Sequence, residues 1–475
     1  MFSKEKSLLK SELLKNFLYE PTLGQYELIE KLCDFIFCTE QNPVFILKGY
    51  AGTGKTSIIG ALTKSLPTVK QRTLLLAPTG RASKVLGKSS NKAAFTIHKK
   101  IYKAAETESG GPYFMLQNNS FVNTLIIVDE ASMIGDSQGL KGELGRNLLE
   151  DLFTFAFQGE NCKLLLIGDT AQLPPVGLSL SHALDKDYLK KNFHLSIFNH
   201  ELTEVMRQSE SSGILTNATK LRNILNEKNI SFPKFSLSNF KDIVKVEGLE
   251  LQENLEDSYS KAGKDETIII TKSNKRANLY NQQIRNRIFM MEEELASGDL
   301  MMVVKNNYFW FSKNKNQQFI ANGDIIKIRK VKSVYELFGF KFADVIISLI
   351  DFEEEPEFDC TLLLDTIYSE TPALTNEQNR KLYLSVLESY ADIENKAERF
   401  LKLKQDKYFN ALQVKFSYAV TCHKAQGGQW GNVFVDQGFF TEEGLTANYL
   451  KWLYTATTRA SEKLYLIGFD DKFFE

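Results

Sequence analysis

The sequence lacks any run of about 18 apolar residues, the length that a membrane-spanning helix needs. It also begins without the long apolar core of a secretory signal peptide, so we expect a cytoplasmic chain with no membrane partner. Its five cysteines, at positions 33, 38, 162, 360 and 422, form no C-x-x-C pair, and its five histidines are equally scattered. This spacing argues against a zinc site and favours a reducing compartment.

Acidic residues are missing from one long stretch of the chain. Between Gln41 and Ala105 there is no Asp or Glu, whereas twelve Lys and Arg fall in the same window, and the net charge of −1 hides this asymmetry. From Asp351 to Glu370 the balance reverses, with eight carboxylates and no basic residue. A charge run usually marks a solvated face. An acid-free stretch of this length is also the sign expected where a polyanion passes.

Apolar runs alternate with helical patterns in two separate series. The chain has 475 residues, 43% of them hydrophobic and 25% charged, which is an ordinary globular composition and enough length for about three domains. The runs are Val44–Leu47, Thr73–Ala77, Leu125–Val128 and Lys163–Ile167 in the first series, and Thr267–Thr271, Asn432–Asp436 and Lys463–Ile467 in the second. This alternation predicts an α/β chain with two parallel sheets, each covered by helices.

The second series is interrupted between about Lys330 and Asn410. Its first half is β-like and predicts a small barrel or sheet. Its second half opens with a capping box at Thr375 and Gln378. Apolar residues then recur at helical spacing as far as Leu401, which predicts a helical extension packed on its neighbours.

The segment from Gly49 to Thr56 fits the pattern G-x-x-x-x-G-K-[ST]. An apolar strand precedes it and a helical segment follows it, which is the context that a phosphate-binding loop requires and a chance glycine-rich turn does not. Backbone N–H groups and the helix N-terminus are expected to wrap a triphosphate, with Lys55 on the β- and γ-phosphates and the Thr56 hydroxyl on Mg²⁺. The expected nucleotide contacts are Gly49, Ala51, Gly52, Thr53, Gly54, Lys55, Thr56 and Ser57.

Two further strand ends carry candidate catalytic side chains. Leu125–Ser132 reads as a buried strand followed by adjacent carboxylates. Asp129 is expected to hold Mg²⁺ through water, and Glu130 to orient and deprotonate the attacking water. After the next apolar strand, a polar turn places Gln172 near the same edge, where it is expected to contact the γ-phosphate. A rigid Pro-Pro loop that does not touch nucleotide is the alternative for Gln172.

These three segments resemble motifs I, II and III of the superfamily 1 helicases, and further segments follow in the right order. Pro21–Gln25 resembles the adenine-reading Q motif, with Gln25 as reader; Leu76–Ala82 and Thr96–His98 resemble motifs Ia and Ib; Glu201–Arg207, Thr421–Gly427 and Tyr454–Ala460 resemble motifs IV, V and VI. Together the matches span nearly the whole chain. The resemblance implies two RecA-like P-loop core domains that bind ATP between them.

The resemblance is strongest to the RecD-like, Dda-type branch, whose members move 5′ to 3′ on single-stranded DNA. Only about 26 residues separate His98 from Leu125, where the opposite-polarity branch carries a whole domain. The RecD-like branch places a short β-hairpin pin there, which we expect at about 104–123. Tyr113 and Phe114 are candidates to cap this pin, or they simply pack the hairpin onto the core. The larger insert matches the small β-barrel, with an extension, that this branch carries.

The resemblance also implies two arginines that offset the charge of the leaving phosphate. They are Arg207 and Arg459, with a surface salt bridge as the alternative for each. Because Arg459 belongs to the second core, it reaches nucleotide only when the cleft between the cores closes. Candidate contacts to the DNA strand are Thr79, Arg81, His98, Thr421 and His423. Candidate stacking partners are Phe95, Tyr102 and Trp430, although a core position is at least as good an explanation for each.

We therefore expect an ATP- and Mg²⁺-dependent translocase and helicase on single-stranded DNA. The expected domains are a first core at 1–208, a second core at 209–329 and 411–475, and an insert at 330–410. Expected partners are single-stranded DNA and its junctions with duplex, and a single-strand-binding protein or nuclease complex, with the chain itself monomeric. Two rivals stay open: a P-loop ATPase that acts on protein, and a DNA-binding clamp that uses ATP only for conformational control. The sequence leaves the choice between DNA and RNA open.

Overall fold

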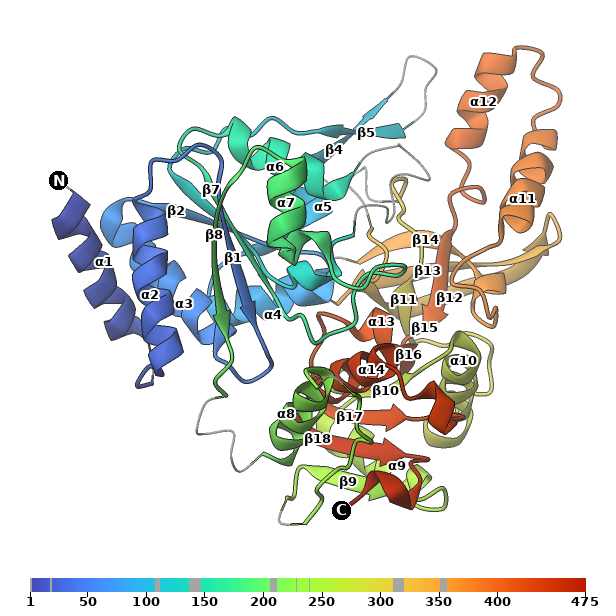
Figure 1. Ribbon diagram of the computed structural model, residues 1–475. Helices are drawn as coiled ribbons and strands as arrows, with labels where there is room; N and C mark the ends of the chain where they lie inside the picture. Colours follow the sequence, from blue (N-terminus) through green and yellow to red (C-terminus); the bar gives the residue numbers. More distant parts are fainter. Residues whose placement is uncertain are drawn as a thin grey trace.

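The computed structural model describes residues 2–17, 19–106, 112–135, 147–205, 212–227, 229–238, 240–310, 320–350 and 357–475. Within them lie two parallel sheets, one closed barrel and one two-stranded hairpin (Figure 1). The expected fold class, two RecA-like cores plus a barrel-like insert, is confirmed. No helix in these ranges has both the length and the apolarity to cross a bilayer.

The first core is a six-stranded parallel sheet in the order β3-β2-β6-β7-β1-β8. Its strands are β1 (Pro43–Gly49), β2 (Arg72–Ala77), β3 (Ala94–Thr96), β6 (Thr124–Val128), β7 (Lys163–Gly168) and β8 (Ser196–Leu202). Alternate side chains of β1 point to opposite faces, so that Val44 and Ile46 pack in one apolar cluster and Phe45 and Leu47 in another. Both faces are therefore covered, which explains the continuous apolar strands.

Helices cover the two faces of this sheet. On one face lie α1 (Phe2–Asn16), α2 (Leu23–Ile36), α3 (Lys55–Ser65) and α4 (Gly80–Ser90); on the other lie α5 (Ile97–Ile101), α6 (Leu148–Gln158) and α7 (Lys186–Asn192). The first of these layers is at the left in Figure 1. The prediction of helices on both sides of a parallel sheet is confirmed for this core.

The second core is a five-stranded parallel sheet in the order β16-β10-β17-β18-β9. Its strands are β9 (Ile243–Val246), β10 (Thr267–Thr271), β16 (Ala419–Thr421), β17 (Trp430–Asp436) and β18 (Ala460–Ile467). Its helices are α8 (Gly213–Leu225), α9 (Leu251–Ala262), α10 (Asn274–Gln283), α13 (Cys422–Ala425) and α14 (Ala447–Thr457). The predicted strands of the second series are all present, and β16 and β9 extend the sheet at its two edges.

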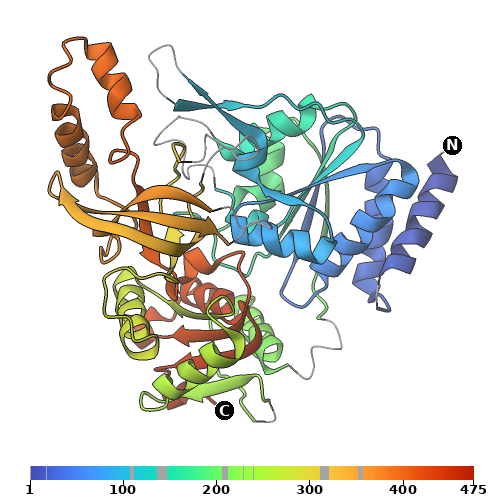
Figure 2. The ribbon, with the colours of Figure 1, turned by 180° about the vertical axis from the view of Figure 1, so that it is seen from behind.

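The insert is a closed barrel of five strands, which lies beside the first core and above the second in both ribbon views (Figures 1 and 2). The strands are β11 (Leu300–Val303), β12 (Ile325–Leu337), β13 (Phe340–Leu349), β14 (Glu357–Leu363) and β15 (Leu412–Phe416). The boundary of 330–410 was too narrow, because β11 pairs with both β12 and β15 and so closes the barrel from outside that range. Closure depends on these long-range pairings, which the local pattern does not encode.

The helical extension is a pair of helices, α11 (Asn376–Glu388) and α12 (Lys396–Lys404), rather than one long helix. The capping box of Thr375 and Gln378 is present and starts α11. Leu382, Val386 and Leu403 pack with barrel residues in one apolar cluster, whereas Leu401 is 41% exposed. The apolar stripe therefore serves two helices that anchor to the barrel at their base and project beyond it (Figure 1).

A short antiparallel hairpin leaves the first core where the pin was expected. It consists of β4 (Tyr102–Glu106) and β5 (Pro112–Leu116). The hairpin therefore begins two residues before the expected range of 104–123 and ends at residue 116, before the end of that range. Tyr113 and Phe114 lie on β5, but their side chains are outside the described part of the structure, so their role at a duplex stays a prediction. Tyr102 is buried at the base of the hairpin and its hydroxyl donates to Asp151 at 2.7 Å, which makes it a core residue.

Candidate nucleotide site and nucleic-acid track

The phosphate-binding loop connects the end of β1 to the start of α3. Gly52 and Gly54 adopt φ values of 76° and 85°, which L side chains rarely adopt. A Cβ at Gly49 would lie 2.9 Å from Thr53 Oγ1 and 3.1 Å from the Lys55 side chain. The glycines of the motif are therefore required by the backbone path and by the close packing inside the loop.

Lys55 lies at the first position of α3 and points back over the loop. Its Nζ donates to the carbonyl oxygens of Gly49 at 2.7 Å and Tyr50 at 2.8 Å. The first turn of α3, which includes Thr56 and Ser57, carries no acidic residue. The ammonium group and the helix N-terminus therefore place positive charge together, as anion binding requires.

Gln25 ties helix α2 to the phosphate-binding loop. Its side chain is buried, its Oε1 accepts from the N–H of Thr22 at 3.0 Å, and its Nε2 donates to the carbonyl of Thr53 at 3.0 Å. Both ends of the amide thus contact protein, the first as part of a capping box. The Gln25 side chain therefore holds the phosphate-binding loop against α2. The recognition of adenine by Gln25 stays a prediction.

Asp129 and Glu130 follow the buried strand β6, as expected. Asp129 Oδ1 accepts from the N–H of Glu130 at 2.9 Å. Burial, with the nearby charge of Glu130, raises the pKa of Asp129 to about 6. Glu130 has a φ of 53°, a left-handed conformation that is uncommon for a glutamate and typical of strained functional positions.

The loop after β7 brings two further polar side chains to the same edge of the sheet. Since β7 lies between β6 and β1, the carboxyl ends of these three strands are adjacent. Asp169 is buried there, and burial raises its pKa while the charge of Lys55 opposes the rise. Gln172 is 5% exposed, and its Oε1 has no hydrogen-bond partner among the residues that the structure describes. A buried amide oxygen of this kind points to a ligand or water that satisfies it.

Arg459 faces the two carboxylates from the second core. Its side chain is 4% exposed, and its Nη1 lies 3.9 Å from Glu130 Oε1. The guanidinium also donates to the carbonyls of Thr455 at 3.1 Å and Gly428 at 3.2 Å, which fix its direction. The structure therefore brings Arg459 to the predicted site. Arg207, the other predicted arginine, lies outside the described residues.

The two cores also meet through Tyr454, which the sequence did not single out. Its hydroxyl donates to Asp169 Oδ2 at 2.6 Å and accepts from the N–H of Ala51 at 2.8 Å. A tyrosine in an apolar helix reads as core packing. One feature of the sequence indicated a role beyond packing: Tyr454 lies in the Tyr454–Ala460 segment, five residues before Arg459.

The segments resembling motifs Ia and V lie against each other where the cores touch. The Thr79 hydroxyl caps α4 by accepting from the N–H of Ala82 at 3.2 Å. A Cβ at Gly427 would lie 2.8 Å from Ala82 Cβ and 3.2 Å from Thr79 Oγ1. Thr421 ends β16, and His423 lies exposed in the first turn of α13. The structure thus brings Thr79 to the contact between the cores, and a role for Thr421 and His423 at a strand stays a prediction.

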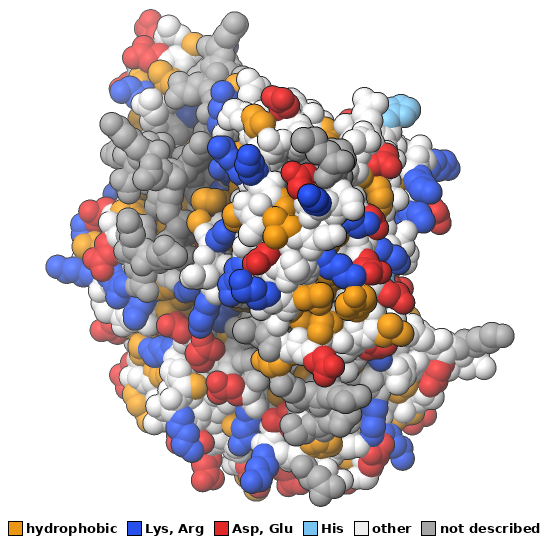
Figure 3. Space-filling model, turned by 90° about the vertical axis from the view of Figure 1, so that its left-hand side faces the viewer, with side chains coloured by type: hydrophobic (Ala, Val, Ile, Leu, Met, Phe, Trp, Pro, Cys, Tyr) orange, Lys and Arg blue, Asp and Glu red, His pale blue; other side chains and the backbone are white. Residues whose placement is uncertain are grey.

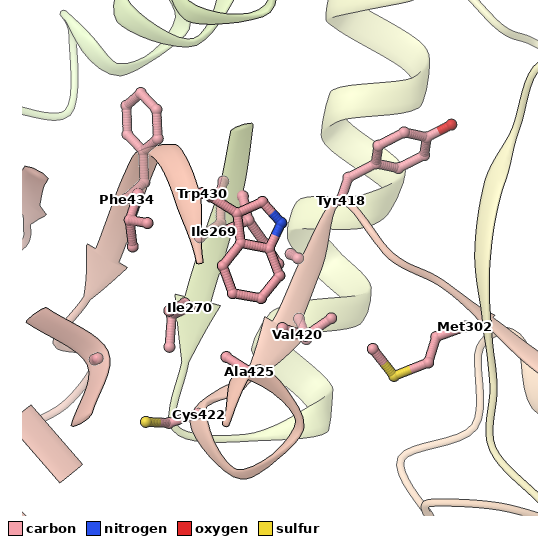
Figure 4. Close-up of a cluster of buried hydrophobic side chains, with 14 of the residues drawn as sticks. Ile269, Ile270, Met302, Tyr418, Val420, Cys422, Ala425, Trp430 and Phe434 are labelled. Carbon is pink, nitrogen blue, oxygen red and sulfur yellow. The ribbon is translucent and has the colours of Figure 1, made fainter. Parts of the chain in front are cut away.

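Arg81 and Trp430, both predicted to meet DNA, contact each other. The Arg81 guanidinium lies 4.1 Å from the Trp430 ring centroid and donates to the carbonyls of Gln429 at 2.9 Å and Asp265 at 3.2 Å. Trp430 is buried beside Ile269 and Val420 in the second core (Figure 4). In this arrangement Arg81 connects the two cores, and the core explanation holds for Trp430.

The acid-free stretch uses several of its cations between domains. Lys84 Nζ donates to the carbonyl of Ile350 in the barrel at 2.7 Å, and Lys99 Nζ lies 3.0 Å from Asp324 Oδ2 at the start of β12. The face that carries α1 and α2 shows basic and acidic side chains interspersed, as on an ordinary solvated surface (Figure 3). Three of the twelve cations of the stretch, Arg81, Lys84 and Lys99, thus lie at contacts between the first core and its neighbours.

A recess lies where the two cores and the barrel meet. Its lining residues include Thr79, Arg81, Lys264, Lys424, Gln426 and Trp430 from the cores and Met302, Ile325 and Ile350 from the barrel side. Burial, reinforced by the charge of Lys415, lowers the pKa of Lys424 to about 8. Arg81, Lys264 and Lys424 thus bring three basic groups to this recess, together with the carboxylate of Asp265.

His98 contributes a neutral ring rather than a charge. Burial lowers its pKa to about 4, and its ring centroid lies 5.8 Å from that of Tyr102. Phe95 is 41% exposed beside it, with the Lys100 ammonium 5.0 Å from its ring centroid. Phe95 therefore remains open as a stacking partner, whereas His98 offers only hydrogen bonding or ring contact.

Two family models match the chain. Residues 22–232 match an AAA domain, and residues 416–467 match a UvrD-like helicase C-terminal domain. The first match covers Gln25, the phosphate-binding loop and both carboxylates, and the second covers the motif V and motif VI segments. Each core therefore carries its own family signature.

The chain is similar to other proteins over most of its length. Uncharacterized protein R530 of Acanthamoeba polyphaga mimivirus is 27% identical, over 91% of this chain and 97% of that one. The RecBCD enzyme subunit RecD of Buchnera aphidicola subsp. Schizaphis graminum is 24% identical, over 90% and 71%. The ATP-dependent DNA helicase dda of Enterobacteria phage T4 is 26% identical, over 59% and 62%. The similarity thus extends far beyond the phosphate-binding loop.

Proposed function

We propose that this chain, a RecD-like DNA helicase of superfamily 1, moves 5′ to 3′ along single-stranded DNA, separates duplex strands, and hydrolyses ATP between its two cores. The direction follows the branch that its motifs resemble. The observation that carries the proposal is the position of Arg459, which reaches from the second core to Glu130 in the first. A site completed by residues of two domains couples phosphate chemistry to their relative movement.

Each polar group at the site has a separate task in hydrolysis. Lys55 binds the β- and γ-phosphates, and Glu130 orients the attacking water and accepts its proton. Arg459 offsets the charge that grows on the leaving phosphates. Gln172 donates from its amide Nε2 to the γ-phosphate, and its Oε1, which has no partner among the described residues, accepts from a water at the site. Arg207 is retained as a second arginine on the motif resemblance alone.

The donor set fits Mg²⁺. Thr56 and Asp129 offer a hydroxyl and a carboxylate, the hard oxygen donors that Mg²⁺ prefers. In the described part of the chain no group of three or more His, Cys, Asp or Glu residues forms a metal cage. Mg²⁺ is usually held by one or two carboxylates together with waters and substrate phosphates, so no such cage is needed. When bound, the ion neutralises phosphate charge beside the buried carboxylate of Asp129.

The nucleic-acid track runs over the ends of β2, β3 and β16. Thr79, Thr421 and His423 offer polar groups to phosphates and sugars, and His98 offers an uncharged ring. Arg81 exchanges its interdomain carbonyl contacts for phosphate when the strand enters. We propose single-stranded DNA and its duplex junctions as the substrates. We also propose a monomer in the cytoplasm that is able to work with a single-strand-binding protein or nuclease complex.

The test combines turnover with strand separation. Wild-type protein is expected to hydrolyse ATP faster with single-stranded DNA and to unwind duplexes with a 5′ overhang. Lys55→Ala and Glu130→Gln are expected to abolish DNA-stimulated turnover while single-strand binding survives. Full turnover by either variant would contradict the site, and unwinding only from a 3′ overhang would contradict the direction. Binding without unwinding by the wild type favours the DNA clamp.

A further inference from the structure

The hydroxyl of Tyr454 bridges the phosphate-binding loop and the Asp169 loop from the other core. Tyr454 lies on α14 and is 1% exposed. Among the described residues it is the only side chain outside the first core that accepts a hydrogen bond from a backbone N–H of the phosphate-binding loop, that of Ala51. The same hydroxyl donates its proton to Asp169 Oδ2 at 2.6 Å. Its donor and acceptor sides are thus directed to two different parts of the nucleotide site.

The Asp169 loop is fastened to the second core at two further points. The N–H of Leu173 donates to Thr455 Oγ1 at 2.8 Å, and the carbonyl of Leu173 accepts from Gln426 Nε2 at 2.6 Å. These three contacts bind the loop that follows β7 to α13 and α14. The bond to Ala51 differs from them, because it is a hydrogen bond from the second core to the backbone of the phosphate-binding loop itself. The Arg222 guanidinium of α8 also contacts this loop, 4.6 Å from the Tyr50 ring centroid.

We infer that Tyr454 is a positioning residue whose hydroxyl exchanges places with a phosphate oxygen of ATP on the N–H of Ala51. An oxygen acceptor supplied to a loop N–H from outside the loop is what a bound phosphate provides. The inference rests on the proposed function, since it assigns a route by which ATP reaches the second core. Tyr454 keeps its bond to Asp169 when it leaves Ala51, so α14 remains attached to the Asp169 loop and is freed from the phosphate-binding loop.

This exchange gives ATP a differential contact with two arrangements of the cores. A ligand shifts a conformational equilibrium only as far as its interactions differ between the two states. With Tyr454 on Ala51, α14 is hydrogen-bonded to the phosphate-binding loop. With phosphate on Ala51, that bond is lost, and the second core touches the loop through the contact of Arg222 with Tyr50. Since α14 leads directly into Arg459, a movement of α14 also repositions the guanidinium.

Tyr454→Phe tests the exchange, because it removes the hydroxyl and leaves the ring. Tyr449→Phe is the matched control: Tyr449 lies on the same helix, is 6% exposed, and its hydroxyl accepts from Gln437 Nε2 at 3.0 Å, away from the nucleotide site. The probes are adenylyl-imidodiphosphate, for nucleotide affinity without hydrolysis, and a labelled oligothymidine, for single-strand affinity with and without that nucleotide.

Removing the competing hydroxyl is expected to tighten binding of adenylyl-imidodiphosphate by about two- to tenfold, the contribution of one hydrogen bond. The KM for ATP falls correspondingly, whereas DNA-stimulated kcat falls because the two cores are no longer coupled through the loop. The change in oligothymidine affinity caused by nucleotide shrinks toward zero. Tyr449→Phe keeps the wild-type value of all three quantities.

Unchanged or weaker nucleotide binding by Tyr454→Phe, with the wild-type effect of nucleotide on oligothymidine affinity, overturns the inference. A structural role alone predicts that pattern together with a lower unfolding temperature, so the sign of the affinity change separates the two explanations. A different observation would contradict the proposed function: ATP turnover by the wild-type protein that does not respond to single-stranded DNA.

Discussion

The Arg459 guanidinium of the second core and the Glu130 carboxylate of the first lie 3.9 Å apart across the nucleotide site. Glu130 adopts a left-handed backbone conformation, and Arg459 is held by carbonyls of its own core. Neither residue has its partner fixed by local structure, so the pair exists only because the cores are apposed. The distance between them therefore reports how closely the two cores approach each other.

We expect Arg459→Ala to lower DNA-stimulated ATP turnover by about 10³- to 10⁵-fold, the range found when a transition-state arginine is removed. Nucleotide affinity is expected to change little, because among the described residues Arg459 meets the first core at Glu130 and makes no hydrogen bond to the phosphate-binding loop. Steady-state turnover and fluorescent-nucleotide binding measure the two effects. Arg380→Ala, at an exposed arginine on α11, is the control and is expected to keep full turnover. A loss of binding equal to the loss of turnover would contradict the catalytic role.

The arrangement of the candidate nucleotide site was largely predictable because its parts lie at strand ends. Gly49–Thr56 joins β1 to α3, and Asp129 and Glu130 follow β6, so the parallel sheet alone places them on one edge. Tyr454 was not predictable, since its burial and helical position fit core packing and its function depends on a partner about 400 residues away (Ala51). Contacts of this kind depend on how the domains are apposed.

The barrel, too, could be predicted only in part from the sequence. Its long strands were visible as β-rich segments, but β11 and β15 are short and close the barrel by pairing with each other across more than a hundred residues. The DNA track was also only partly visible. The sequence made Arg81 a candidate strand contact and left Trp430 open between a stacking partner and a core residue, whereas the structure pairs the two across the cores. A single sequence does not show whether a cation contacts a ligand or a neighbouring domain.

We expect Gly427→Ala to separate the two cores. A Cβ at this position would lie 2.8 Å from Ala82 Cβ of the first core, so the second core must move to accommodate it. Gly468→Ala is a matched control, because Gly468 has a similar φ, 69° against 72°, and open space around its Cβ position. Both changes are expected to cost about 1–2 kcal/mol of stability through backbone strain. Only Gly427→Ala is expected to reduce DNA-stimulated turnover, and equal turnover by the two variants would contradict the close contact.

The ion pair of Lys99 and Asp324 is expected to hold the barrel against the first core. Asp324 is fully buried and also accepts from the N–H of Ala321 at 2.8 Å, whereas the Lys99 side chain is 13% exposed. Removing the lysine alone leaves a buried charge, which costs about 3–5 kcal/mol. We therefore expect Lys99→Met to destabilise the protein more than Lys99→Met combined with Asp324→Asn. Equilibrium unfolding of both single variants and the double variant gives the coupling energy, and simple additivity would show that the pair is not coupled.

We expect affinity for single-stranded DNA to fall as the pH rises through about 8, the pKa to which burial lowers Lys424. Below that pH the ammonium of Lys424 is charged and attracts a backbone phosphate; above it the free protein loses the proton, and binding must take one up. The affinity for single-stranded DNA is therefore expected to be complete at pH 7 and to fall progressively between about pH 8 and 9.5. Anisotropy titrations of a labelled oligothymidine at constant salt measure the effect. Lys424→Arg, whose guanidinium stays charged, is expected to remove the pH dependence while binding persists. An identical pH profile in Lys424→Arg would show that Lys424 does not contact the strand.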